Sequence, residues 1–87
     1  GTRCGAAISK EIESVGIPVA LVTTLVPIAL FTGAYRIIPG YAIVHPLGNP
    51  DLSASRERDM RRHIVMAALK SLETEVAGSR VFDWSKG

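Results

Sequence analysis

Gly16-Ile17-Pro18-Val19-Ala20-Leu21-Val22-Thr23 is the stretch that decides the fold. Gly16 can end a helix, and Ile17-Pro18 prevents a helix from continuing because proline restricts the residue before it. Val19–Thr23 is uncharged and rich in apolar residues, as strands covered on both faces of a sheet are. A helix, a tight turn and a buried strand in this order make half of an α/β repeat.

The residues before this stretch have the spacing of an amphipathic helix. Ile8, Ile12 and Val15 stand at i, i+4 and i+7, with polar residues between them. We therefore expect a helix over residues 4–15, ended by Gly16.

The residues from Ser14–Tyr35 include no charged side chain, and about 20 apolar residues are enough to cross a bilayer. Pro18 and Pro27 divide this run, however. We expect the buried strand, a turn and then a short helix over Thr24–Phe31, with Pro27 in its first turn and Gly33 as its stop, rather than a membrane span.

The middle of the chain reads as loop structure around one short strand. Arg36–Tyr41 is expected to be irregular, with a turn at Pro39-Gly40. Ala42–Val44 is expected to form a strand that leads into the loop His45–Pro50, whose prolines constrain the backbone.

A long helix and an aromatic tail close the sequence. We expect the helix over residues 54–77, with an apolar stripe at helical spacing. The stripe consists of Met60, Ile64, Val65, Ala68, Leu69, Leu72 and Val76. The tail Val81–Gly87 contains Phe82 and Trp84, for which the sequence shows no clear partner within the chain.

Together these elements predict the α/β class. We expect residues 1–87 to form a single domain with a small parallel sheet flanked by helices, a partial Rossmann-like or flavodoxin-like layer. A sheet this small has open edges, so we expect a homo-oligomer or a further segment of a larger subunit to complete its core.

Composition limits the classes of function. Hydrophobic residues make up 47% and charged residues 21%, which is typical of a globular chain. The net charge of +2 is too small to imply a nucleic-acid partner. A single cysteine excludes an internal disulfide or a cysteine-based zinc site and points to a reducing, cytoplasmic compartment. The sequence opens with no signal-peptide pattern, and we expect neither a metal site nor a membrane partner.

Cys4 is the first candidate for chemistry. It stands at the start of the expected helix, where the helix dipole and the neighbouring charge of Arg3 favour the thiolate, the nucleophilic form. The alternative is a small buried residue without chemistry, since cysteine is often buried.

Three further residues are candidates for binding. His45 follows an expected strand, where open α/β sheets bind ligands, or else its ring holds the proline-rich loop that also contains Asn49. Arg36 either binds a substrate carboxylate or pairs with an acidic neighbour, and we favour the pair. The basic stretch Arg56–His63 could bind phosphate or nucleic acid, but Glu57 and Asp59 stand four residues before Arg61 and His63, which favours a solvated helix face.

Several stretches taken together resemble one family. They are Thr2–Ala7, Lys10–Glu13, Gly16–Val19, Arg36–Pro39 and Ile43–Ser53, of which the segment His45-Pro46-Leu47-Gly48-Asn49-Pro50 is the most distinctive. They resemble the C-terminal region of the substrate-specific selenoprotein B subunit of glycine, sarcosine and betaine reductases, to which D-proline reductase is related. The resemblance runs from Thr2 to about Val76.

The resemblance implies an oxidoreductase that reductively deaminates glycine, sarcosine, betaine or a related amine in anaerobic bacteria. In that family a selenocysteine lies a few residues upstream of the position that Cys4 matches, and its selenolate displaces the amine and passes a carboxymethyl group to selenoprotein A. A sister subunit supplies a pyruvoyl group, and thioredoxin supplies reducing equivalents. The resemblance thus makes Cys4 a resolving thiol and makes Arg3 and the His45–Asn49 loop part of the pocket or a subunit interface.

This sequence departs from the family because it contains neither a selenocysteine nor a second cysteine. We expect a C-terminal piece of a larger subunit, inactive alone and without a cofactor of its own. One hypothesis is that an in-frame selenocysteine codon was read as a stop. The alternatives are a stand-alone thiol-redox module and a dimerisation module without catalysis, in which Cys4 would be buried.

Overall fold

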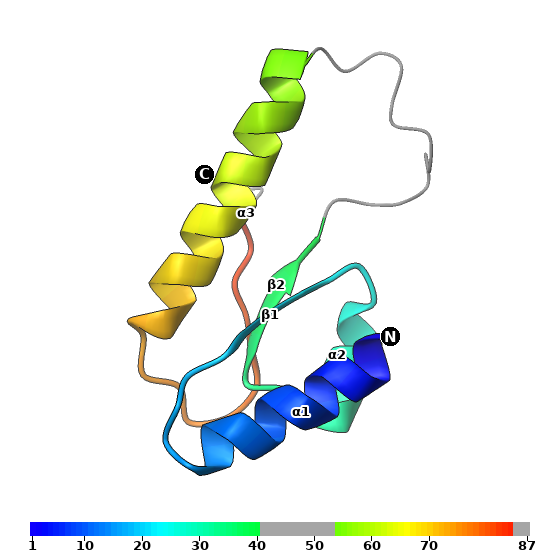
Figure 1. Cartoon of the computed structure of the whole chain (residues 1–87), viewed down its shortest axis with the longest axis vertical. Helices are drawn as coiled ribbons and strands as arrows, with labels where there is room; N and C mark the ends of the chain where they lie inside the picture. The colour runs from blue at the N-terminus through cyan, green and yellow to red at the C-terminus, as the bar shows by residue number, and fades with distance from the viewer. Residues whose placement is uncertain (41–53, 85–87) are drawn as a thin grey trace.

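The computed structural model describes residues 1–40 and 54–84. The elements follow in the order α1 (Thr2–Ser14), β1 (Ala20–Thr23), α2 (Val26–Thr32), β2 (Arg36–Pro39), α3 (Ala54–Leu72) and β3 (Arg80–Val81) (Figure 1). The strands form a parallel sheet in the order β1-β2-β3. The expected α/β class, with a small parallel sheet and flanking helices, is confirmed.

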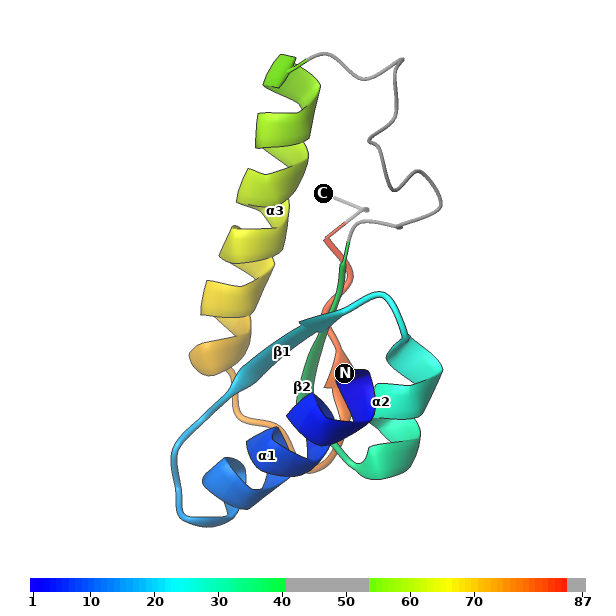
Figure 2. The same cartoon turned by 45° about the vertical axis from the view of Figure 1, so that its right-hand side comes forward.

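The helices form two layers around this sheet. α1 and α2 pack against each other and against β1 and β2, whereas α3 packs against the same two strands from the other side (Figures 1 and 2). Successive side chains of a strand point to opposite faces of the sheet, so Ile37 and Ile38 of β2 pack against different helical layers. Both are fully buried, which makes β2 the centre of the fold.

The core between the sheet and the α1–α2 layer is built from small residues around one large one. Ala6, Ala29 and Ala34 are fully buried around Ile37, with Leu21 and Val26 packed against them. Because three members of this core are alanines, the two helices can approach the sheet closely where these residues lie. A methyl group added at Gly5 would lie only 3.3 Å from Leu21 Cδ1, so the same closeness extends along α1.

Local signals set the first half of the fold as the sequence predicts. α1 ends at Ser14 and Gly16 follows with a φ of 90°, a left-handed conformation that glycine adopts without strain. Gly33 caps α2 in the same region with a φ of 95°. Helix, strand and short helix thus appear where they are expected.

The expectation that Arg36–Tyr41 is irregular is wrong for its first four residues, which form the central strand β2. Arg36 is charged and Pro39 lacks a backbone N–H, so the sequence disfavours a buried strand here. The structure compensates for both. Glu13 of α1 pairs with Arg36. β3 pairs with β2 only as far as Ile37, so no hydrogen bond between these strands is lost because Pro39 has no N–H. The strand expected at Ala42–Val44 lies outside the described residues.

The aromatic tail has partners, contrary to expectation. Arg80 N and Phe82 N donate to the carbonyls of Tyr35 and Ile37, which adds β3 to the sheet. Phe82 is 8% exposed, and the indole N–H of Trp84 donates to the Pro39 carbonyl. These partners lie more than forty residues earlier in the chain, so no local pattern reveals them.

The long helix is also shorter than expected, because α3 ends at Leu72 rather than at residue 77.

Candidate functional site

The first turn of α1 lies at the carboxyl edge of the sheet, which is the side where the parallel strands end. The tight connection at Gly16 reverses the chain, so α1 runs against β1 and its N-terminus reaches the end of that strand (Figure 2). The hydroxyls of Thr2 and Thr23 lie 2.7 Å apart, and Gly40 N donates to the Thr23 carbonyl at 2.7 Å. The structure therefore brings the Arg3-Cys4 turn to the edge where open parallel sheets bind ligands.

A shallow hollow of about 290 Å³ opens at this edge. Its lining consists of Thr2, Val22, Thr23, Thr24 and Gly40. The Thr23 hydroxyl also accepts a hydrogen bond from Leu25 N at 3.0 Å, so the turn after β1 is held in place. A methyl group at Gly40 would lie 3.4 Å from the backbone of Thr23, so Gly40 packs closely against the end of β1.

Sequence reasoning missed the threonines of this hollow. The signal available was the pair Thr23-Thr24 at the end of a predicted strand, which is the end at which open parallel sheets bind ligands. The contribution of Thr2 was not visible, because it depends on the packing of α1 beside β1. Hydroxyl groups can donate and accept hydrogen bonds, so the hollow suits a small polar molecule.

Cys4 and Arg3 are both exposed on the first turn of α1. Neither lines the hollow, whose contribution from this helix is Thr2. The exposure of Cys4 contradicts the alternative in which this cysteine is a buried packing residue. A thiol that solvent reaches is also one that a second protein or a disulfide can reach.

Iodoacetamide is expected to alkylate Cys4 completely in the folded chain, at a rate close to the rate in urea, because Cys4 is exposed. Mass spectrometry over time measures the reaction, and Cys4→Ser serves as the blank. A thiol that reacts only after urea is added would contradict the exposed position.

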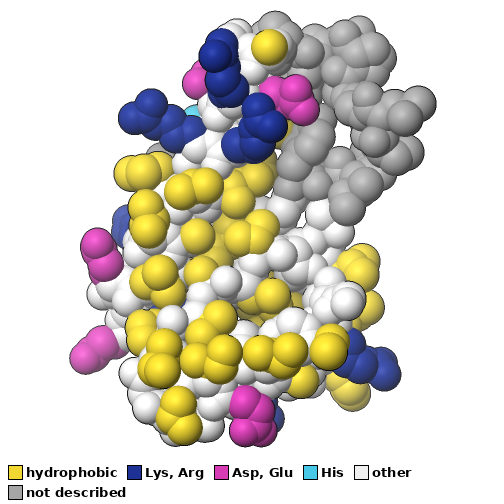
Figure 3. Space-filling model, in the orientation of Figure 1, with side chains coloured by type: hydrophobic (Ala, Val, Ile, Leu, Met, Phe, Trp, Pro, Cys, Tyr) yellow, Lys and Arg dark blue, Asp and Glu magenta, His cyan; other side chains and the backbone are white. Residues whose placement is uncertain are grey.

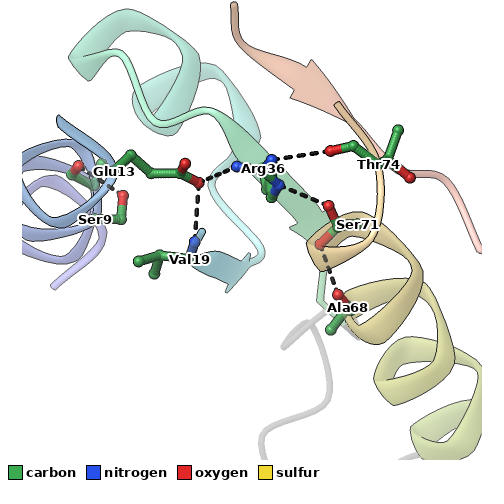
Figure 4. Close-up of polar contacts among 8 residues, drawn as sticks. Ser9, Glu13, Val19, Arg36, Ala68, Ser71 and Thr74 are labelled. Atoms are coloured by element: carbon green, nitrogen blue, oxygen red, sulfur yellow. Dashed lines mark hydrogen bonds and ion pairs between the residues drawn. The ribbon is translucent and has the colours of Figure 1, made fainter. Parts of the chain in front are cut away.

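Arg36 lies at the opposite end of the sheet from Cys4. It begins β2, and its guanidinium reaches Glu13, nine residues along α1 from Cys4, a separation of about 13 Å at the helical rise. Nε donates to the Ser71 carbonyl at 2.6 Å and Nη2 to the Thr74 carbonyl at 2.9 Å (Figure 4). Arg36 could have bound a substrate carboxylate or paired with an acidic neighbour, and the structure shows the pair with an acidic neighbour. The guanidinium thereby connects α1, β2 and the end of α3.

The remaining predicted residues are not part of the described site. His45 and Asn49 lie outside the described residues, a few positions after β2 ends at the carboxyl edge. The basic residues Arg58, Arg61 and Arg62 are exposed on α3, as a solvated helix face requires. Within residues 1–40 and 54–84 no three metal-ligating side chains come together, and no helix there is both long and apolar enough to span a membrane.

Fold and site together define a small parallel α/β unit that presents polar groups and an exposed thiol at its carboxyl edge. The chain is 58% identical over 82 residues to the glycine reductase complex component B subunit gamma of Carboxydothermus hydrogenoformans. It is 52% identical to the sarcosine reductase complex component B subunit beta of Peptoclostridium acidaminophilum, and 40% identical to the betaine reductase complex component B subunit beta of the same organism.

These alignments cover 93–94% of this chain but only 18–19% of each relative. The chain is therefore similar to about a fifth of a component B subunit. The names of the relatives describe subunits of multi-component reductase complexes. No family model matches the chain, and no solved structure matches it significantly.

Proposed function

We propose that this chain supplies the Cys4 turn and the carboxyl-edge hollow of a component B subunit in a glycine, sarcosine or betaine type of reductase complex. The single observation that carries the proposal is 58% identity over 82 residues, nearly the whole chain. Three relatives that act on different amines all share this segment. A segment common to all of them fits a role in the shared reductive step better than a role in amine selection.

The proposed chemistry assigns each part of the edge a task. Cys4 is the resolving thiol: its thiolate attacks the sulfur of a selenenyl-sulfide that joins a thiol of another component to a selenocysteine expected upstream of Cys4, so the Se–S bond breaks, the selenolate leaves and Cys4 forms a disulfide. The dithiol of thioredoxin then reduces this disulfide and is itself oxidised to a disulfide. Its exposure supports this role, because the attacking sulfur must reach another atom. Arg3 supplies positive charge beside it, and Thr2 and Thr23 line the adjoining hollow. The amine-activating pyruvoyl group, selenoprotein A and thioredoxin belong to other components of the complex.

The test is a chimera in which this chain replaces the matching segment of the Carboxydothermus hydrogenoformans subunit. Glycine reduction is then measured with the other components of that complex present. We expect activity close to that of the parent subunit, and no turnover from the isolated chain. An inactive but folded chimera would contradict the proposal, as would turnover by the isolated chain.

Replacing Cys4 with serine in the chimera is expected to lower turnover at least about tenfold, equivalent to about 1.4 kcal/mol of transition-state free energy. Serine is close to cysteine in size and keeps a hydrogen-bonding group, but it cannot form the disulfide through which Cys4 would release the selenolate. Ala7→Ser is the matched control, since Ala7 is exposed on the same helix and also gains a hydroxyl. Equal activity of C4S and A7S would remove Cys4 from the mechanism.

A small thiol-redox module is the second candidate function, favoured by the exposed position of Cys4 alone. It differs in needing no component B partner. A mixed disulfide of the isolated chain with thioredoxin, together with an inactive chimera, would support this candidate over the first.

A further inference from the structure

The outer edge of β1 has the composition of an interior strand, yet no strand among residues 1–40 and 54–84 lies beside it. β1 is the first strand of the order β1-β2-β3 and so forms one edge of the sheet. Its residues Ala20–Thr23 carry no charge and no proline. Strands that remain at an edge in water are usually shortened or protected by charge, proline or a bulge, since a bare edge invites pairing.

The backbone geometry shows which groups this edge offers. The Thr23 carbonyl accepts from Gly40 N and therefore points toward β2. Because N–H and C=O groups alternate along a strand, those of Leu21 also point toward β2, and those of Ala20 and Val22 point outward. No described residue of this chain pairs with these outward groups.

The other edge of the sheet makes an internal comparison. β3 consists of only Arg80 and Val81, and the Arg80 side chain lies over the Phe82 ring. A strand this short with a charged residue is a protected edge. The two edges therefore differ: β1 is the longer strand, is uncharged and has no partner on its outer side among the described residues.

Apolar side chains continue this open edge into both helical layers. On α3, Val65, Leu69 and Leu72 are exposed at helical spacing, on the side away from the residues that face the tail. Ile8 on α1 and Val15 directly after it are exposed on the side away from Lys10, which lies against Gly33 at the end of α2. Figure 3 shows hydrophobic side chains gathered over α3, β1 and α1 on one face. An apolar surface that crosses three elements is typical of an interface.

We propose that the β1 edge is where this unit joins the rest of a component B subunit, which adds a further strand beside Ala20–Thr23. The inference rests on the proposed function, because the occupant is the part of such a subunit outside the matched segment. That part is large, since the match covers 19% of the relative. A strand with flanking helices would pair the outward groups of Ala20 and Val22 and cover the apolar side chains of both layers.

Amide hydrogen exchange in the chimera described above tests the docking directly. We expect the amides of Ala20 and Val22 to exchange about 100-fold more slowly in the chimera than in the isolated chain, because they become hydrogen-bonded. The Val81 amide, which points outward from the other edge, is expected to exchange at the same rate in both. Unchanged exchange at Ala20 and Val22 in an active chimera would overturn the docking and leave the proposed function intact.

A charge on the edge gives a second, independent measurement. Val22 and Val81 are 47% and 37% exposed, so the isolated chain should tolerate lysine at either position. We expect V22K to lower the melting temperature of the chimera by several degrees and V81K to leave it unchanged. Equal shifts for the two variants would contradict a strand at the β1 edge.

The remaining outcomes separate the two proposals. A chimera with slowed exchange but no activity would contradict the proposed function and support the docking. A chimera that does not fold would overturn both, because the segments would not be equivalent. An isolated chain that dimerises, and that V22K makes monomeric, would assign the edge to a second copy and overturn the proposed occupant.

Discussion

Replacing Arg36 with methionine is expected to destabilise the chain by about 3–5 kcal/mol, the usual cost of removing one partner of a buried ion pair. The Arg36 and Glu13 side chains are only 10% and 8% exposed. The variant would leave the Glu13 carboxylate in the interior without its counter-charge. It would also remove the donors to the carbonyls of Ser71 and Thr74, at the end of α3.

A loss of this size is severe for so short a chain. Small domains bury a modest fraction of their surface, and typical stabilities are only about 5–15 kcal/mol. In urea denaturation followed by circular dichroism, we expect R36M to show a strongly lowered midpoint or no cooperative transition.

The chain offers a matched control at the neighbouring strand. Arg80 pairs with Arg36 in the sheet register but is exposed, so R80M is expected to change stability by no more than about 1 kcal/mol. A double variant, Glu13→Leu with Arg36→Met, should recover part of the loss, because it leaves no unpaired charge. Similar stabilities for R36M and R80M would show that the Arg36 contacts do not hold the layers together.

Replacing Ile37 with alanine is the second large effect, expected to cost about 2–5 kcal/mol. Ile37 is fully buried among Ala6, Ala29 and Ala34. The three alanines have no long side chains, so within this cluster Leu21 and Val26 alone could move into the space and part of the cavity would persist. Thermal and urea denaturation measure the loss.

A graded series makes this prediction specific. Ile37→Val should cost about 0.5–1.5 kcal/mol, because only one methyl group is removed. Ile8→Ala, at a position that is 55% exposed, should stay within about 0.5 kcal/mol in the isolated chain. A loss for I37A no greater than for I8A would mean that the small core around Ile37 contributes little to stability.

The first half of the fold follows from the sequence, because its signals are local. The helical spacing of Ile8, Ile12 and Val15, the stop at Gly16 and the apolar run into Thr23 act over a few residues each. The same holds for Gly33, whose positive φ ends α2. Local geometry therefore predicted α1, β1, α2 and the α/β class.

The central strand could not be predicted in this way. Arg36 is unfavourable in a buried strand until a carboxylate compensates its charge, and Glu13 stands 23 residues away. The tail likewise becomes β3 only because β2 offers it carbonyl groups. Both depend on partners that approach only in the folded chain.

The candidate site also has features that the sequence predicts and features that depend on tertiary contacts. The sequence by itself marked Cys4 and Arg3 at a helix start, since residue type and neighbouring charge are properties of the chain. Only the tertiary structure decided that this turn lies beside Thr23 at the carboxyl edge and that Arg36 lies at the far end. The physical reason is that hydrogen bonds and ion pairs between distant residues form once burial makes an unpaired polar group costly, whereas helix and turn preferences act before any packing exists.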